Sequence, residues 1–238
     1  MPRRAPLSLA LLAFSALVAA AAGAQLESGG ALPSPEIDDD RHTSYRQVTW
    51  GDFLDAGASR SSRGRGGTPD AVDPESPASW VSAWLLPAAH LDQVEIVAEP
   101  LAQGEQAVDR RDRWRARAAT FRVYSLMDKR SSGVVPGHED LETLEHEQGH
   151  FDLAELCARR LRHEVGQLET YGRTAEQAQE RLYEALTRKH ETLGRHFRLL
   201  QQRYDGETDH AQKRRAQKRW RKSIDRWLAQ EIPQTCNG

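Results

Sequence analysis

The pentapeptide at 146–150, His-Glu-Gln-Gly-His, has residue types and spacing that suit metal-assisted hydrolysis. On a helix that turns about 100° per residue, His150 lies about 40° from His146, so both imidazoles can bind one zinc ion. Glu147 is displaced sideways and reaches the metal-bound water instead of the metal. Zinc lowers the pKa of that water toward about 7, and a carboxylate accepts its proton during attack on a carbonyl. The motif therefore predicts a zinc hydrolase with ligands His146 and His150 and general base Glu147.

The same helix face also fits a structural interpretation, in which the two histidines are buried and hydrogen-bonded without a metal. A core-facing helix shows apolar residues at similar spacing, as in Leu153, Cys157 and Leu161. The two variable positions of the motif, after Glu147, are the uncharged Gln148 and Gly149, and this context favours zinc.

Three separated blocks extend the pattern beyond the motif: residues 144–155 (LEHEQGHFDLAE), 49–53 (TWGDF) and 204–210 (YDGETDH). Together they resemble a bacterial domain-of-unknown-function family that is described as predicted secreted zinc-dependent proteases. The resemblance spans roughly residues 45 to 231 and implies an exported zinc peptidase. The chain departs from the family pattern at Ala211, where a glycine is expected after the downstream histidine.

A catalytic zinc ion normally has three protein ligands and one open position. Glu155 is excluded as the third ligand, because it lies about 140° around the helix from His150. We favour His210, which belongs to the downstream block and follows a predicted turn at Gly206. The alternatives are three residues of the preceding predicted helix: Glu184, His190 and Glu191.

Two further residues near the motif allow two interpretations each. Tyr204 either ends an apolar stripe as a core aromatic residue, or is catalytic and donates a hydrogen bond to the oxyanion of the tetrahedral intermediate. Asp152 either anchors a neighbouring backbone group or arginine, or orients a ligand histidine.

The elements that would position these residues differ between the two halves of the chain. Segments 45–54, 93–97 and 119–126 alternate apolar or β-branched residues with polar ones, which predicts a small antiparallel sheet. Between His138 and Pro233 the chain contains no proline and is rich in helix-forming residues. The sequence predicts an α+β fold, with a small N-terminal antiparallel sheet followed by three helices, the first of which carries the motif.

The predicted helices run from about 139 to 168, from Thr174 to Asp205–Gly206, and from 208 or 209 to just before Pro233. Thr174 and Gln177 have the spacing of a capping box, and Gly206 suits a left-handed helix end. The second and third helices each show one apolar stripe at three- and four-residue steps, formed by Leu182, Leu186, Leu193, Phe197, Leu200 and Tyr204, and by Ala216, Trp220, Ile224, Trp227 and Leu228.

The N-terminus has the features of a secretory signal peptide over residues 1–24: two arginines, an apolar run from Leu7 to Ala22, and Ala-Gly-Ala before Gln25. This predicts a secreted or periplasmic protein without a transmembrane segment after cleavage. Loss of Arg3 and Arg4 changes the formal charge of −2 to about −4, which does not favour nucleic-acid binding. In such a compartment Cys157 and Cys236 can form a disulfide, or Cys157 can be a buried apolar residue.

Composition divides the remaining chain. Residues 25–44 and 55–79 are rich in Gly, Ser, Pro and Asp, so we expect a disordered linker and a flexible loop around a folded domain at 45–231, with a tail at 232–238. Residues 213–222 include seven basic residues, which form either a solvated helix face or a contact with anionic envelope polymers or lipids. The sequence indicates no oligomeric state.

Two functions remain open. The first is a zinc-dependent metallopeptidase that hydrolyses a peptide or amide bond of the cell envelope, with a peptide or peptidoglycan-type substrate. The second is a non-catalytic envelope protein with a structural zinc ion, or with a partner-binding helical hairpin at 174–204. Glu147 favours the first, because a structural zinc site needs no general base.

The signal-peptide prediction is tested by N-terminal sequencing of exported protein. We expect the sequence to begin at or within a few residues of Gln25, because a signal peptidase cleaves after the small-residue pattern. Exported protein that still begins at Met1 would contradict this prediction.

Overall fold

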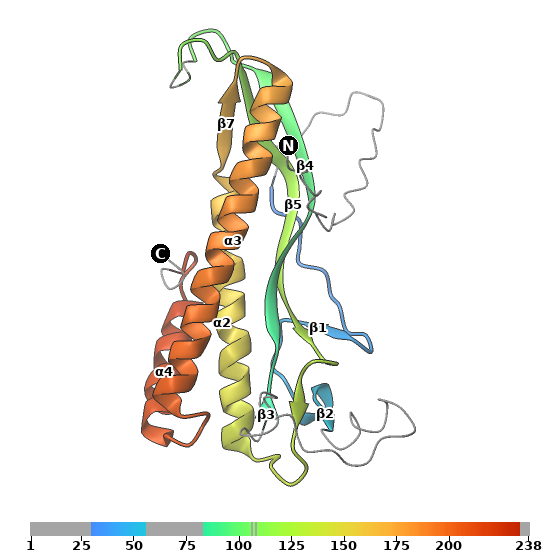
Figure 1. The fold of residues 1–238 in the computed structure, drawn as a ribbon, viewed down its shortest axis with the longest axis vertical. Coiled ribbons are helices and arrows are strands. Elements are labelled where there is room, and N and C mark those ends of the chain that lie inside the picture. Colours follow the sequence, from blue (N-terminus) through green and yellow to red (C-terminus); the bar gives the residue numbers. More distant parts are fainter. Residues whose placement is uncertain (1–29, 56–82, 106, 108, 234–238) are drawn as a thin grey trace, which may run out of the picture.

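The computed structural model describes residues 30–55, 83–105, 107 and 109–233. Antiparallel strands come mostly from the N-terminal half and three helices from the C-terminal half, so the predicted α+β class is confirmed (Figure 1). The predicted signal peptide, residues 56–79 of the predicted loop, and Cys236 lie outside the described residues. Cys157 is buried on its helix and is not a free thiol.

The main sheet is built on a long antiparallel hairpin of β4 (Pro87–Pro100) and β5 (Trp114–Asp128). β1 (His42–Ser44) and β7 (Glu169–Gly172) pair with the other edge of β5, one near each of its ends. The predicted strands at 93–97 and 119–126 are confirmed as parts of β4 and β5.

A small second sheet places β6 (Gly133–Val134) between β2 (Leu54–Asp55) and β3 (Ala83–Trp84). β2 pairs with β6 in parallel and β3 pairs with it antiparallel.

The predicted strand at 45–54 is wrong. This segment contains the short 3-10 helix η1 (Trp50–Asp52), and only its last residue enters β2. The physical reason is Asp52, whose carboxylate accepts a hydrogen bond from the Thr49 amide at 2.8 Å and pairs with Arg46. These local bonds close a turn where the alternation of apolar residues predicted an extended chain.

The predicted linker at 25–44 is described from residue 30 onward, where it is mainly loop but pairs with the main sheet at two places. The Leu32 amide donates to the Phe121 carbonyl of β5 at 2.8 Å, and β1 joins the sheet. The Ser44 amide donates to the Ile37 carbonyl at 2.7 Å. Backbone pairing with β5 therefore includes this segment in the folded body despite its polar composition.

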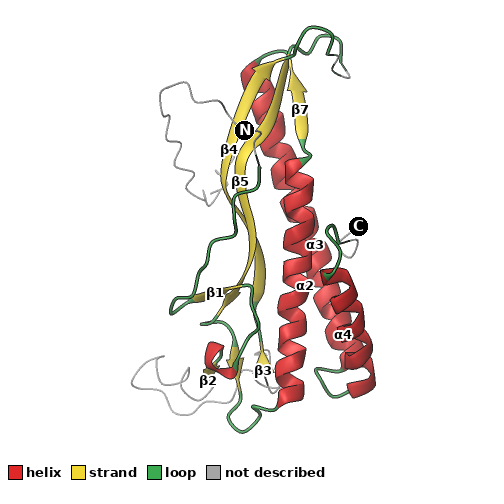
Figure 2. Ribbon diagram, turned by 180° about the vertical axis from the view of Figure 1, so that it is seen from behind, coloured by secondary structure: helices red, strands yellow, loops and turns green. Residues whose placement is uncertain are grey.

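The three helices are α2 (Leu141–Gly166), α3 (Ala175–Thr208) and α4 (Arg214–Leu228). The Asp140 side chain accepts a hydrogen bond from the Thr143 amide at the start of α2. The Thr174 hydroxyl accepts one from the Gln177 amide at the start of α3, as the predicted capping spacing requires. α2 and α3 cover one face of the main sheet, and α4 packs on their outer side (Figure 2). No helix among the described residues is both long and apolar enough to cross a membrane.

The predicted end of α3 at Asp205–Gly206 is wrong, because the helix continues through Gly206 to Thr208. The left-handed residues are Asp209, His210 and Ala211, with φ of 55°, 48° and 72°. α4 accordingly begins at Arg214 instead of 208 or 209. As a result Asp205 belongs to the last turn of α3, where its side chain faces α2.

α2 and α3 approach closely where Gly149 faces Tyr204. A Cβ atom added to Gly149 would lie 2.7 Å from Cζ of the Tyr204 ring, so only glycine leaves room for the ring. Tyr204 is buried together with Leu153, Leu156, Trp220 and Ile224 in the cluster that joins the three helices. The predicted apolar stripes of the second and third helices are confirmed by this packing.

Two glycine substitutions test this contact. Gly149→Ala should destabilise the protein by about 1–3 kcal/mol through overpacking. Gly206→Ala should stabilise it by about 0.5–1 kcal/mol, because a Cβ there meets no atom within 4 Å and alanine favours the helix. Both effects are measured by denaturant unfolding. Equal stability of the two variants would show that the helices can separate at Gly149 without cost.

Candidate metal centre

Three donor atoms from α2 and α3 converge on one point. The Nε2 atoms of His146 and His150 are 3.2 Å apart. Oδ1 of Asp205 lies 3.2 Å from Nε2 of His146 and 2.8 Å from Nε2 of His150. Within the described residues, these three side chains are the group of metal-ligating type with convergent donor atoms.

The other ring nitrogens have partners that assign the tautomers of both histidines. Gln201 donates from Nε2 to the His150 carbonyl at 3.1 Å, which turns its Oε1 acceptor toward Nδ1 of His150. Thr208 donates its hydroxyl hydrogen to the Tyr204 carbonyl at 2.6 Å, so its oxygen accepts from Nδ1 of His146, 3.5 Å away. Each Nδ1 therefore carries a hydrogen, and each Nε2 presents a lone pair to the point of convergence.

Three acceptors that face one another away from bulk water on the histidine side repel, and a positive charge between them relieves the repulsion. An additional proton on His150 can provide this charge, and so can a metal cation. A tetrahedral zinc ion with bonds of about 2.0–2.1 Å holds its ligand atoms about 3.3 Å apart. The observed separations of 2.8–3.2 Å are close to this spacing, so the residues fit a zinc-sized ion.

The pKa values of the three residues reflect their mutual charge in the metal-free protein. Burial lowers the pKa of His146 to about 4, against the opposing hydrogen bond to Asp205. Burial also acts to lower the pKa of His150, but the hydrogen bond to Asp205 and the charge of Glu147 outweigh it and raise the pKa to about 9. For Asp205 burial is again outweighed, here by its close contacts with Nε2 of both histidines and by the charge of protonated His150, and its pKa falls well below the usual range. His150 thus supplies the cation when no metal is bound.

Glu147 is buried beside this cluster, on the flank that faces the β3–β4 connection. The backbone amide of Leu85 lies on the carboxylate side and favours its ionised form, while Oε2 has no hydrogen-bond partner among the described residues. Burial raises the pKa of Glu147 to about 7. A carboxylate with a free oxygen and a pKa near neutrality has the properties of a general base.

His210, the predicted third ligand, lies next to the cluster instead of within it. Its Nδ1 is 3.5 Å from Oδ1 of Asp205, and its ring centre is 6.4 Å from that of His146. About a third of its side chain is exposed, as for Asp205, whereas the two motif histidines are almost fully covered. Solvent therefore reaches the cluster from the end of α3, past Asp205 and His210.

The alternative ligands on α3 lie far from the cluster. His190 approaches the Ala89 carbonyl of β4, and Glu184 pairs with Arg188. Glu191 is exposed one residue beyond His190, which lies about 22 Å along the helix from Asp205. The fold therefore does not bring these residues to the motif.

Tyr204 packs against the cluster but directs its hydroxyl elsewhere. Its ring stacks on His146 with centres 4.7 Å apart, and its O–H donates to the His146 carbonyl at 3.2 Å. This geometry fits the interpretation of Tyr204 as a core aromatic residue. Asp152 pairs with Arg221 of α4 and accepts from Tyr45 at 2.9 Å, so the interpretation of Asp152 as an anchor for an arginine is confirmed.

Asp205 is the residue that sequence reasoning missed, although it stands beside Tyr204 in the downstream block. It was assigned to a helix end because glycine follows it. A signal was present nevertheless, because Gln201, Asp205 and Thr208 recur at steps of four and three, which places them on one helix face.

Comparisons of this chain with models of protein families, with curated proteins and with solved structures found no match. The family resemblance of the three sequence blocks stays a prediction. The case for a metal centre rests on the geometry of the described residues.

The choice between Asp205 and His210 is tested by metal affinity. Asp205→Ala should weaken zinc binding by more than about 100-fold, because loss of a ligand exceeds the 10- to 100-fold effect typical of residues that only support ligands. His210→Ala should change the affinity less. Competition with a chromophoric chelator measures both constants. A larger loss for His210→Ala would restore His210 as the third ligand.

Proposed function

We propose that this chain is an exported zinc-dependent hydrolase that cleaves a peptide or amide bond in the cell envelope. His146, His150 and Asp205 hold the metal, and Glu147 is the general base. The observation that carries the proposal is the buried Glu147 carboxylate, with one unpaired oxygen, beside three convergent metal donors. A purely structural site does not require such a costly carboxylate.

The donor set suits zinc, which binds imidazole nitrogen and carboxylate oxygen and keeps a fourth position open in catalytic sites. When bound, zinc supplies Lewis acidity that polarises a carbonyl and lowers the pKa of water. Glu147 accepts the proton released during attack, and its pKa of about 7 makes it competent at neutral pH.

The surrounding residues keep this arrangement in place. Gln201 and Thr208 hold the histidines in the tautomers that direct Nε2 toward the metal. Tyr204 donates its hydroxyl hydrogen to α2 and is not available to an oxyanion in this arrangement. His210 lies on the solvent side of Asp205, where substrate would approach.

The envelope substrate is supported by the sequence. The signal-peptide pattern at 1–24 predicts export, and the resemblance to predicted secreted zinc-dependent proteases implies peptide-bond hydrolysis. Peptides and peptidoglycan-type polymers are therefore the substrate classes to assay.

Glu147→Gln tests the catalytic role. The variant should retain zinc and reduce turnover by about 100-fold or more, because the amide cannot accept the proton. Zinc content is measured by metal analysis, and activity on a panel of peptides and peptidoglycan fragments. Glu145→Gln is the matched control, since it makes the same change at an exposed position two residues away and should leave turnover unchanged.

Full activity of zinc-loaded Glu147→Gln would contradict the hydrolase proposal. In that case the non-catalytic envelope protein with a structural zinc ion is the better interpretation.

A further inference from the structure

The outward face of α4 carries basic residues alone. Five exposed cations recur along the helix within a sector of about 100° and over about 16 Å: Arg215, Lys218, Arg219, Lys222 and Arg226. We call these five residues the cationic ridge. No acidic residue of α4 lies within this sector; its one acid, Asp225, lies beside it and pairs with Arg221.

The remaining cations at this helix are already neutralised. Lys213 pairs with Asp209, Arg214 with Glu142, and Arg221 with Asp152. By contrast, no member of the cationic ridge forms an ion pair with a carboxylate of the described residues. Arg219 still acts on Glu207, whose pKa it helps to lower, but the other four cations present positive charge without an ion-pair partner among the described residues. The overall charge of the chain is slightly negative.

The cationic ridge points away from the protein because the opposite face of α4 is buried. Ala216, Trp220 and Ile224 are buried against α2 and α3, and Gln217 donates to the Glu142 carbonyl at 2.7 Å. α4 is the outermost helix in both views (Figures 1 and 2). Because its apolar side is occupied by the protein itself, α4 cannot insert into a bilayer and can offer only its charged outer surface.

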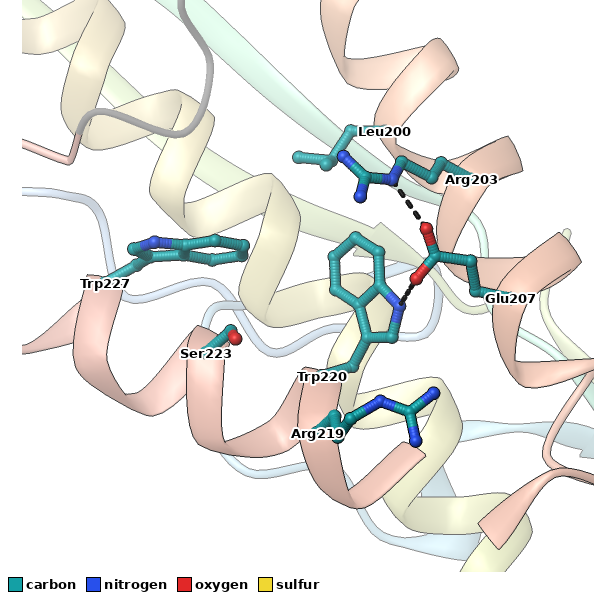
Figure 3. Close-up of a pocket in the computed structure, with 7 residues that line it drawn as sticks. All are labelled: Leu200, Arg203, Glu207, Arg219, Trp220, Ser223 and Trp227. Atoms are coloured by element: carbon teal, nitrogen blue, oxygen red, sulfur yellow. Dashed lines mark hydrogen bonds and ion pairs between the residues drawn. The ribbon is translucent and has the colours of Figure 1, made fainter. Parts of the chain in front are cut away.

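A pocket of about 380 Å³ borders the ridge between α3 and α4 (Figure 3). The rings of Trp220 and Trp227 project into it, and Glu207 is held by Arg203 at 2.7 Å and by Trp220 Nε1 at 2.8 Å. Leu199 is 62% exposed and lies one helical turn before Arg203. The partly exposed ring of Trp227 therefore lies in the pocket that Arg219 of the ridge also lines, while Trp220 is buried.

We propose that the cationic ridge docks the protein on the surface of an anionic lipid bilayer. Each lysine or arginine close to such a surface contributes favourably, and tryptophan and leucine suit the interfacial zone. A bilayer surface can meet all five cations at once, because they lie within one sector of α4, and the partly exposed Trp227 borders them. The proposal does not depend on the metal centre, because the ridge and the ligands share no residue.

Vesicle co-sedimentation of protein purified from the exported fraction tests the proposal. The protein should bind vesicles of phosphatidylcholine mixed with phosphatidylglycerol, and high salt should release it from them. It should not bind vesicles of pure phosphatidylcholine. The triple variant Lys218→Gln, Lys222→Gln, Arg226→Gln should bind about 100-fold more weakly. Its circular dichroism and unfolding curve should match those of the unaltered protein, because all three side chains are exposed.

The control variant Arg110→Gln, Arg111→Gln, Arg130→Gln has the same net charge change at exposed positions away from α4 and should keep its affinity.

Equal loss in the control variant would overturn the proposal, because net charge alone would then explain binding. Absence of binding to anionic vesicles at low salt would also overturn it. Binding of a soluble polyanion such as polyglutamate, with the anionic vesicles left unbound, would assign the ridge to an envelope polymer instead.

Discussion

The site depends on the mutual repulsion of three acceptor atoms, two on buried histidines and one on the partly exposed Asp205, and a cation between them relieves it. Two imidazole lone pairs and one carboxylate oxygen face the same point at separations of 2.8–3.2 Å. Asp205 and the charge of Glu147 raise the pKa of His150 to about 9, so a proton on His150 can supply this positive charge. A divalent ion in the same position would interact with all three atoms at once. The geometry is therefore suited to metal binding before any metal arrives.

The three donor atoms converge only while α2 and α3 keep one position relative to each other, and several contacts fix that position. Gly149 allows the ring of Tyr204 to lie against α2, and the Tyr204 hydroxyl bonds to the His146 carbonyl. α4 supports Tyr204 from behind, with Trp220 packed edge-on at 5.2 Å. The ion pair of Asp152 and Arg221 ties α4 to α2 two residues beyond the motif. Each helix thus contacts the site either directly or through Tyr204.

The sequence predicted the elements whose periodicity is strong and missed those set by tertiary contacts. The apolar spacing along α3 and the alternation at 93–97 and 119–126 were reliable, because burial of one face dictates both. The sequence could not predict where α3 ends, because three successive non-glycine residues adopt left-handed backbone at a cost of about 1–2 kcal/mol each. Long-range contacts must offset that cost, and a local pattern does not display them.

Because the predicted helix ended at Asp205, the sequence did not predict that Asp205 lies on the face of α3 that contacts α2. The glycine expected at 211 has its physical reason here, since Ala211 adopts φ of 72°. The motif histidines were found because their spacing lies within one turn of one helix. Asp205 lies 55 residues beyond His150, and only the packing of α2 on α3 brings them together.

Glu147 and the metal donors are linked by charge. Burial raises the pKa of Glu147 to about 7, so near neutral pH the metal-free protein holds this carboxyl partly protonated. A divalent cation at the donors would favour the ionised form, because opposite charge lowers the pKa of a nearby carboxyl group. By reciprocity, ionised Glu147 would favour the cation. The same burial that makes the carboxylate costly without a metal thus makes it responsive to one, and this is the property that a general base beside a metal requires.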